Sequence, residues 1–200
     1  MAYVEHYYTQ FYSGEYYHLY NRGVDRKSIF KSRSNYSYFL RQWTKYLEGY
    51  VNVIAFSLND NHFHFLVQVN HFSESDLDGK PVHELITGRL KKFFQSYTMA
   101  FNKQHGRIGT LFQTPFKRAL VAKLEDLSTL IAYIHLNPQK HGLIADFRNW
   151  EWTSYGKILQ FKRSLVDKEF VLEWFGGKKQ FIDFHAQEFK ETDILSLIDE

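Results

Sequence analysis

Residues 51–69, VNVIAFSLNDNHFHFLVQV, constrain the fold of this chain more than any other stretch. Two apolar runs of strand length, 51–58 and 62–69, are separated by only three residues, 59–61. Those three residues are Asn, Asp and Asn, which tolerate the left-handed backbone of a tight turn. The pattern therefore predicts an antiparallel β-hairpin whose two strands lie side by side in a sheet.

The second strand of this hairpin carries two histidines. Because side chains alternate between the two faces of a strand, His62 and His64 project from the same face, while Phe63 and Phe65 face the other side. Two imidazoles at this spacing are within reach of one metal ion. A His-x-His pair on its own is more often an ordinary part of a half-exposed sheet, so further ligands have to be found elsewhere.

The segments on either side of the hairpin alternate between strand and helix patterns. Apolar residues recur at every second position in a strand and at three- and four-residue spacing in a helix. The expected elements are a strand at 16–22, a helix at 34–47, a helix at 82–104, one strand or two short ones within 110–121, and a helix from about 124 that ends before Pro138.

This order of elements predicts an α+β fold. Two strand–helix–strand halves that share a central hairpin favour a ferredoxin-like antiparallel sheet with helices packed on one face. Beyond Gly142 the pattern weakens, and we expect one domain over residues 1–158 and a C-terminal extension of unknown role over 159–200.

Composition narrows the class of protein. The 200 residues are enough for a sizeable core, and aromatic residues reach 18%, a type that fills cores or stacks on bases. The chain has no cysteine, which excludes disulfides, thiolate metal sites and a cysteine nucleophile. With no signal peptide pattern and no apolar run of about 20 residues, we expect a cytoplasmic protein that does not contact membranes.

Positive charge is concentrated in one part of the chain. The net charge is only +3, but residues 89–123 contain eight Lys or Arg and no Asp or Glu. Such a segment suits a phosphate-binding surface, and it is also compatible with an ordinary solvated face. The basic candidates for contact with the phosphates of a nucleic acid are Arg22, Arg89, Lys91, Lys92, Lys117 and Arg118.

The helix predicted after residue 124 offers further chemistry. Tyr133 and Asn137 are four residues apart and so share one helical face, whereas His135 points elsewhere on the helix. A Tyr hydroxyl can attack a phosphodiester and form a covalent phosphotyrosine. A divalent ion held by two imidazoles and an amide would stabilise the charge that develops on the phosphate.

Five segments, in this order along the chain, resemble a known family. They are YHLYNRGV (17–24), NHFHFLV (61–67), GTLFQTPFKRALV (109–121), YIHLNPQKHGL (133–143) and WEWTSYGK (150–157). NHFHFLV is similar to the His-hydrophobic-His (HUH) motif of the single-tyrosine DNA transposases. The segment from 133 is similar to their tyrosine helix, in the form found in the REP-associated tyrosine transposases.

The resemblance implies an enzyme that cleaves and rejoins single-stranded DNA, often at a hairpin or palindromic repeat. By position, Tyr133 would be the nucleophile and His62, His64 and Asn137 the ligands of Mg²⁺ or Mn²⁺. Some relatives are homodimers that exchange tyrosine helices between subunits, and others act as monomers. The turn before the motif commonly reads Met-Pro-Asn in relatives, whereas this chain has Asn-Asp-Asn at 59–61.

Two other functions remain open from the sequence. A non-catalytic or domesticated DNA- or RNA-binding module on the same fold would bind nucleic acid without needing a metal. A metal hydrolase would use His62 and His64 to activate water, and it would need a carboxylate ligand, for which the hairpin offers only Asp60.

Overall fold

A four-stranded antiparallel sheet forms the centre of the protein. The computed structural model describes residues 8–189, and its sheet has the strand order β2-β3-β1-β4. This order and the alternation of strands with helices α2 and α4 are those of the ferredoxin-like fold, so the predicted fold class is confirmed. The strands are β1 (Tyr16–Arg22), β2 (Val51–Leu58), β3 (His62–Val69) and β4 (Lys117–Leu120).

The hairpin predicted from residues 51–69 is the β2–β3 pair. Val51 pairs with Val69 at its open end, and Leu58 pairs with Phe63 beside the turn. The turn is closed by a hydrogen bond that the backbone N–H of Asn59 donates to the carbonyl of His62. β1 lies antiparallel to the other edge of β3, with Arg22 opposite His62. The histidine strand is therefore central in the sheet, where both of its edges are paired.

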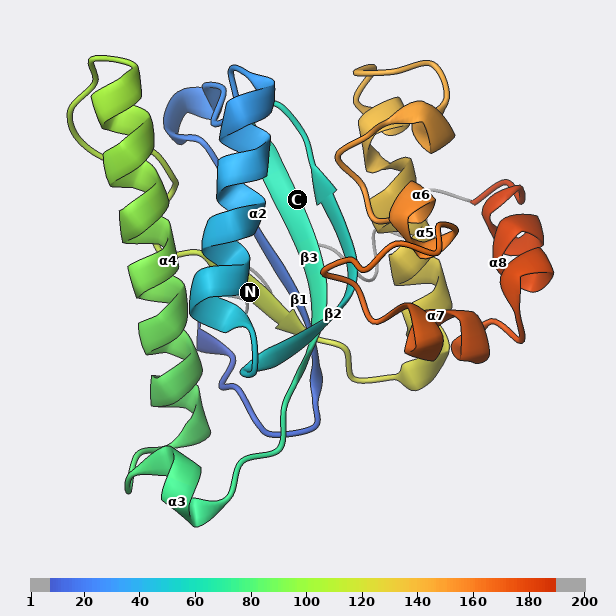
Figure 1. Ribbon diagram of the computed structural model, residues 1–200, viewed down its shortest axis with the longest axis horizontal. Helices are drawn as coiled ribbons and strands as arrows, with labels where there is room; N and C mark the ends of the chain where they lie inside the picture. The colour runs from blue at the N-terminus through green and yellow to red at the C-terminus, as the bar shows by residue number, and fades with distance from the viewer. Residues whose placement is uncertain (1–7, 190–200) are drawn as a thin grey trace.

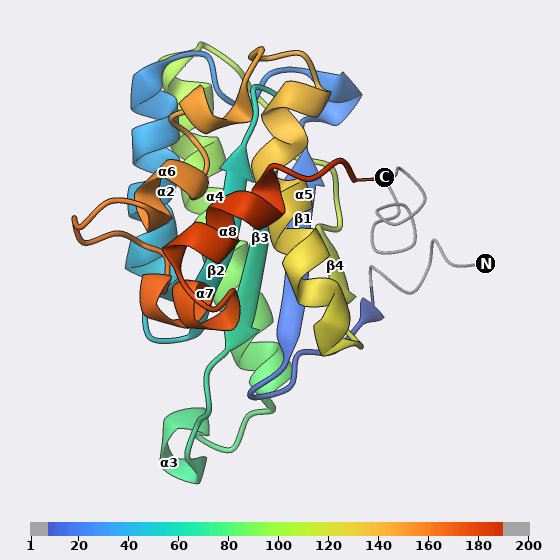
Figure 2. The ribbon, with the colours of Figure 1, turned by 90° about the vertical axis from the view of Figure 1, so that its right-hand side faces the viewer.

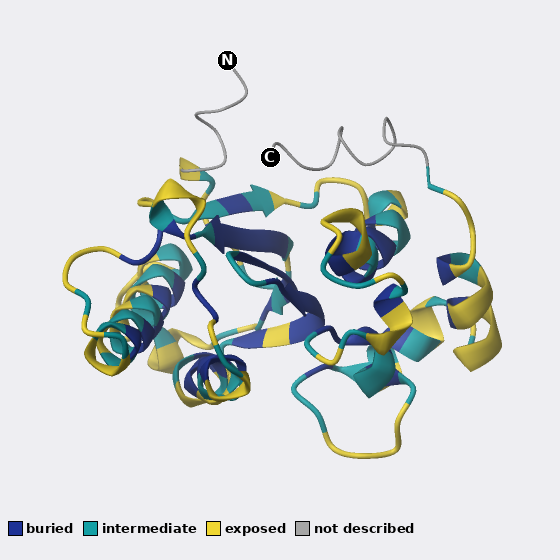
Figure 3. Cartoon of the chain, turned by 90° about the horizontal axis from the view of Figure 1, so that it is seen from above, coloured by how far each residue is buried: buried dark blue, intermediate teal, exposed yellow. Residues whose placement is uncertain are grey.

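Helices α2 (Arg33–Leu47) and α4 (Val82–Gln104) cover one face of the sheet, as predicted (Figure 1). Their apolar stripes meet the alternate side chains of β3. The Trp43 ring stacks on Phe65 with the ring centres 3.7 Å apart, and both side chains are almost fully buried. Seen from above, buried residues line the sides of both helices that face the sheet, and most of the sheet itself (Figure 3). Burial of these aromatic rings supplies the main hydrophobic stabilisation of the domain.

Helix α5 (Leu127–Lys140) lies against the opposite face of the sheet, over β2 and β3 (Figure 2). The expected end of this helix before Pro138 is wrong, because Pro138 lies inside it. Proline disfavours helical geometry in the preceding residue, but here that residue is Asn137, whose fully buried side chain accepts a hydrogen bond from Asn59 and donates one to Tyr133. Tertiary contacts thus override the local preference and extend the helix.

Short helices complete the C-terminal part of the described chain, on the same side of the sheet as α5 (Figure 1). The backbone N–H of Asp167 donates to the carbonyl of Val53, which ties the segment before α7 to the edge strand β2. Trp174 in α7 donates from its indole N–H to the Ser128 hydroxyl in α5. The remaining elements are η2 (Val24–Arg26), α3 (Glu74–Leu77), η3 (Leu124–Asp126), η4 (Phe147–Asn149), α6 (Tyr155–Ile158), α7 (Lys168–Trp174) and α8 (Lys178–His185).

A buried chain of hydrogen bonds connects β2, α5 and α8. Ser154 Oγ accepts from the backbone N–H of Phe56 and lies 2.6 Å from His135 Nε2. His135 Nδ1 lies 2.8 Å from His185 Nε2, and His185 Nδ1 lies 2.7 Å from the Phe181 carbonyl. The Phe181 carbonyl fixes the direction of the chain, because a carbonyl can only accept: His185 donates to Phe181, His135 donates to His185, and Ser154 donates to His135.

The segment 110–121 does not form one continuous strand. Phe112 makes an isolated bridge to Gly23, and regular pairing begins only at β4. The alternative of two short pieces separated near Pro115 is the closer description, since proline lacks the N–H that a ladder needs. Within residues 8–189, no helix is long and apolar enough to cross a membrane.

Candidate functional site

The two histidines of β3 lie on the face of the sheet that α5 covers. His62 is 6% exposed and His64 is 1% exposed, and their ring centres are 5.2 Å apart. Phe63 and Phe65 point to the opposite face, among the aromatic rings under α2 and α4. The alternation predicted from the sequence therefore holds, and both imidazoles face the helix that carries Tyr133.

Helix α5 places Tyr133 and Asn137 beside this pair. The Tyr133 ring is edge-on to the His64 ring, with the centres 5.8 Å apart. Asn137 Nδ2 donates to the Tyr133 hydroxyl at 3.0 Å, as expected for residues one helical turn apart. Asn137 Oδ1 lies 3.0 Å from His62 Nε2. All four residues singled out for catalysis and metal binding thus come together within one chain.

The ring orientation of His62 is fixed by its neighbour in the turn. Asn61 donates from its amide nitrogen to the Arg26 carbonyl, so its oxygen faces His62 Nδ1 at 2.6 Å. That oxygen can only accept, so Nδ1 carries the proton of the neutral imidazole. His62 Nε2 is then a lone-pair atom directed at Asn137, which is the tautomer that a metal ligand requires.

Two acceptor atoms consequently face each other in the site. Because Asn137 uses its nitrogen on Tyr133, its oxygen is directed at the lone pair of His62 Nε2. Two lone pairs repel at 3.0 Å unless a positive or donor group lies between them. The amide nitrogen of Asn59 contacts both atoms in this structure, at 2.6 Å from His62 Nε2 and in a short contact with Asn137 Oδ1. A cation could satisfy the same two atoms.

His64 is held on the β1 side by another histidine. Its Nδ1 lies 2.9 Å from Nε2 of His18, and the two rings and that of Tyr20 stack in parallel. Burial holds the pKa of His64 well below its usual range, and the nearby charges of His18, His62, His141 and Arg22 lower it further. A neutral imidazole is the form that binds metal, and a hydrogen bond at Nδ1 leaves ligation to Nε2.

The donor set fits a divalent cation that prefers mixed nitrogen and oxygen ligands. A hollow of about 20 Å³ lies against His62 and His64 and is lined also by Arg22 and Lys117, a volume that suits one ion or water. Within the described part of the chain, no group of three or more His, Cys, Asp or Glu side chains is arranged to hold a metal. Protein ligation would therefore rest on two imidazoles and on amide oxygen, with open positions left for phosphate or water.

Two of the six basic residues predicted to contact DNA lie at this hollow. Arg22 ends β1 opposite His62, and Lys117 begins β4 opposite Tyr20. Lys117 also lies 5.4 Å from the centre of the Tyr20 ring. Both strands end at the same edge of the site, so two cations flank the histidine pair.

Arg118 is directed away from the site. It pairs with Leu19 on the face covered by α2 and α4, is 6% exposed, and donates to the Thr9 carbonyl at 2.5 Å. Its guanidinium lies over the rings of Phe11 and Phe116. The side chain anchors the segment before β1, and DNA contact by Arg118 stays a prediction that this position does not favour.

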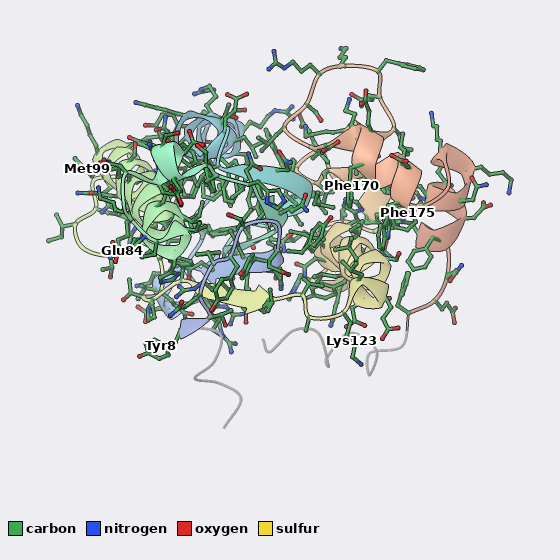
Figure 4. The ribbon with its side chains drawn as sticks, turned by 90° about the horizontal axis from the view of Figure 1, so that it is seen from below. Tyr8, Glu84, Met99, Lys123, Phe170 and Phe175 are labelled. Atoms are coloured by element: carbon green, nitrogen blue, oxygen red, sulfur yellow. The ribbon has the colours of Figure 1, made fainter. Side chains whose placement is uncertain are left out.

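The three basic residues of α4 lie on the far side of the sheet from the histidines. Lys91 and Lys92 are exposed, and Arg89 is half-buried with its guanidinium 4.1 Å from the centre of the Tyr50 ring. Figure 4 shows α4, which carries Glu84 and Met99, at the opposite end of the molecule from Phe170 and Phe175 of the C-terminal part. DNA contact at α4 would therefore need a strand that reaches around the edge of the sheet.

The sequence analysis missed several residues of the site. His18 was part of an aromatic strand, and Asn59 was considered only as a turn residue. Lys140 and His141 lie in the segment that resembles the tyrosine helix, but neither was assigned a role. The His141 ring centre is 4.6 Å from that of His62, and the Lys140 ammonium is 5.5 Å from the centre of the Tyr133 ring. The even spacing of His18 and Tyr20 was the one available signal, since it places both on the face paired with His64.

A larger cavity, of about 810 Å³, lies next to the tyrosine helix. It is bounded by α5 and by the segment from α8 to Phe189. Tyr133, Lys140 and Arg148 are among its lining residues. The tyrosine is only 2% exposed, although it is among the residues that line this cavity.

Comparisons with known proteins identify the fold class. No model of a known protein family matches the sequence, and no curated protein matches it. Seven solved chains match the structure. One of them, at a TM-score of 0.58 and 15% identity, is a REP-associated tyrosine transposase bound to a REP hairpin; the match covers 80% of this chain and 93% of that chain. The chain thus has the fold of the family that its motifs resemble.

Proposed function

We propose that the protein is a tyrosine transposase that cleaves and rejoins single-stranded DNA with the help of Mg²⁺ or Mn²⁺. The observation that carries the proposal is the contact between the tyrosine helix and the histidine strand: Asn137 links the Tyr133 hydroxyl to His62 through its two amide ends. A nucleophile, an amide oxygen and two imidazoles meet in one buried place, as covalent phosphotyrosine chemistry requires.

In this proposal His62, His64 and Asn137 hold the ion, and the ion supplies positive charge to the phosphate oxygens. Asn61 keeps His62 in the tautomer that ligates through Nε2, and His18 orients the His64 ring. Such partners behind the ligands fix ring direction and basicity. The chain's own residues thus prepare the site before DNA arrives.

The cleavage step is a displacement at phosphorus. The Tyr133 oxygen bonds to the phosphorus as the bond from phosphorus to the 3′ oxygen breaks; the phenolic proton is lost, and the released 3′ oxygen gains a proton. The product is a 5′-phosphotyrosine with a free 3′-hydroxyl. Rejoining is the reverse reaction with a 3′-hydroxyl as the attacking group. The Lys140 ammonium near the Tyr133 ring favours the negative charge that develops on the phenolic oxygen.

The proposed substrate is single-stranded DNA with a hairpin or palindromic repeat. The solved chain of the same fold is bound to a REP hairpin. Arg22 and Lys117 flank the histidines and would neutralise phosphates next to the cleaved bond. The contact of the tyrosine helix with the histidines of its own chain supports a site formed within one chain, and this proposal holds for a monomer or a homodimer.

The test uses a pool of single-stranded oligonucleotides that carry stem-loops of varied sequence. Incubation with Mn²⁺ or Mg²⁺ should give a covalent protein–DNA adduct that survives denaturation, and mass spectrometry should locate the DNA on Tyr133. Tyr133→Phe removes the nucleophilic oxygen but keeps the ring, so it should form no adduct. Cleavage by the Phe variant at the wild-type rate would contradict the proposal.

Two controls separate this function from the other candidates. DNA binding without an adduct, indifferent to chelator and to His62→Ala, would indicate a non-catalytic or domesticated module. Metal-dependent cleavage without a covalent intermediate would indicate a hydrolase that activates water.

A further inference from the structure

The side chain of Asn59 lies in the centre of the site, and its role as a turn residue does not explain this position. It is fully buried, although it lies at the start of the hairpin turn. Its amide nitrogen contacts His62 Nε2 and Asn137 Oδ1, and its amide oxygen accepts a hydrogen bond from Ser57 Oγ at 3.3 Å. A turn needs only the backbone of this residue, so the side-chain contacts call for a different reason.

The two atoms that Asn59 contacts cannot be satisfied by one another. The Nδ1 proton of His62 is committed to Asn61, and the Asn137 nitrogen is committed to Tyr133, so both facing atoms are acceptors. The Asn59 nitrogen supplies donor hydrogens to both. The nitrogen thus lies where a cation would lie between the same two atoms.

We propose that Asn59 is a further ligand of the divalent ion, through its side-chain oxygen Oδ1. This inference rests on the proposed function, because it assumes that His62 and Asn137 bind the metal. In the absence of metal, the amide nitrogen of Asn59 bridges the two acceptors and keeps the tyrosine helix docked. With metal bound, the amide rotates by half a turn, and its oxygen is directed at the ion.

Rotation in place is the only movement that the surroundings favour. The side chain is fully buried between β2, β3 and α5, which leaves no space for it to swing away. The two ends of an amide have nearly the same shape, so the rotation displaces no neighbouring atom. Ser57 can both donate and accept through its hydroxyl, so it accepts from the Asn59 nitrogen after the rotation. An unrotated amide would direct its donor hydrogens at a cation.

The first test is the affinity for Mn²⁺ without DNA, measured on the full-length protein by electron paramagnetic resonance or titration calorimetry. Asn59→Leu keeps the number and branching of the side-chain heavy atoms and removes both amide ends. If Asn59 is a ligand, the variant should bind Mn²⁺ at least about 10-fold more weakly, the lower end of the loss seen when groups at a metal site are removed. Equal or tighter binding would overturn the proposal, since it would mean that Asn59 only competes with the ion.

Asn35→Leu is the matched control. Asn35 is also a buried asparagine, 3% exposed, but it bonds Lys31, Gln104 and His105 at the start of α2. The Asn35→Leu variant should bind Mn²⁺ with unchanged affinity. Like Asn59→Leu, it should lower stability, because it removes the hydrogen bonds of a buried amide. If wild-type protein binds no Mn²⁺, the metal part of the proposed function fails; if wild type and Asn59→Leu bind equally, only the role of Asn59 fails.

A second variant covers the case in which Asn59→Leu does not fold. Asn59→Asp has the same shape and puts a carboxylate oxygen at the ion, so it should bind Mn²⁺ more tightly than wild type. Nuclear magnetic resonance during a titration with diamagnetic Mg²⁺ gives an independent signal. The chemical shifts of the side-chain amide protons of Asn59 should change, because these protons move from Asn137 to Ser57. An unchanged amide signal at saturating Mg²⁺, or no gain of affinity in Asn59→Asp, would overturn the proposal.

Discussion

The buried pair His135 and His185 should make the protein less stable at acidic pH. Burial lowers the pKa of His185 from 6.5 to about 4, and the hydrogen bond to the Phe181 carbonyl opposes this shift. The pKa of His135 also lies well below its usual range, because of burial first and the neighbouring His185 second. Both rings are therefore neutral in the folded protein, as the direction of their hydrogen bonds requires.

The sign follows from linkage between protonation and folding. A histidine with a lowered pKa in the folded state binds its proton more readily when the chain unfolds, so stability is complete above pH 6.5 and falls as the pH approaches 4. For His185, the shift from 6.5 to about 4 removes about 2 kcal/mol of unfolding free energy between pH 7.5 and pH 5.

His185→Gln isolates this contribution. The Gln side-chain oxygen can accept from His135 Nδ1 in place of the His185 nitrogen, but Gln does not titrate. Urea unfolding, followed by tryptophan fluorescence at several pH values, should show that the variant loses about 2 kcal/mol less than wild type between pH 7.5 and pH 5. His71→Gln, at an exposed histidine, is the control and should parallel wild type. Parallel curves for His185→Gln and wild type would refute the reasoning.

Three further predictions concern DNA contact, the core and the origin of the tyrosine. Lys117→Ala and Arg22→Ala should each weaken DNA binding and lower the slope of log affinity against log salt by about 1, measured by fluorescence anisotropy; an unchanged slope would exclude phosphate contact. Trp43→Ala should cost about 3–5 kcal/mol in urea unfolding, and a loss below about 1 kcal/mol would contradict its stacking in the core. A mixture of Tyr133→Phe and His62→Ala proteins should form no DNA adduct, whereas restored adduct would reveal helices exchanged between subunits.

The sheet and its two covering helices could be predicted because each has a clear period. The alternation in 62–69 and the three- and four-residue spacing in 34–47 record which side of each element is buried. The end of α5 could not be predicted this way. Pro138 is a local signal against helix, and what overrides it is the hydrogen bond that Asn137 accepts from Asn59, which is far away in the sequence.

The candidate site was predictable where its residues carry their own chemistry. Two histidines at strand spacing, and a Tyr and an Asn one helical turn apart, suggested reactive groups before their positions were known. Asn59 and His18 gave no such signal, because an asparagine in a turn and a histidine in an aromatic strand are ordinary. Their parts depend on which strands pair, and pairing is a property of the whole chain. Arg118 shows the converse. Its basic side chain, inside a segment that resembles the family, predicted contact with DNA, but its pairing with Leu19 directs it toward the core.

The C-terminal extension beyond residue 158 matched no known pattern, yet its contacts bear on the tyrosine. On one side of α5, Asn137 accepts a hydrogen bond from Asn59 of the hairpin turn; on another side, His135 is bonded to Ser154 and to His185 of α8. Each set consists of buried polar groups that would lose their partners if the helix moved away, and each lost bond costs about 1–3 kcal/mol. An exchange of tyrosine helices between two subunits would break the first set within each chain and form it again with the partner, whereas α8 follows α5 in the chain and would be exchanged with it. The hairpin and α8 thus each contact the tyrosine helix, from different sides.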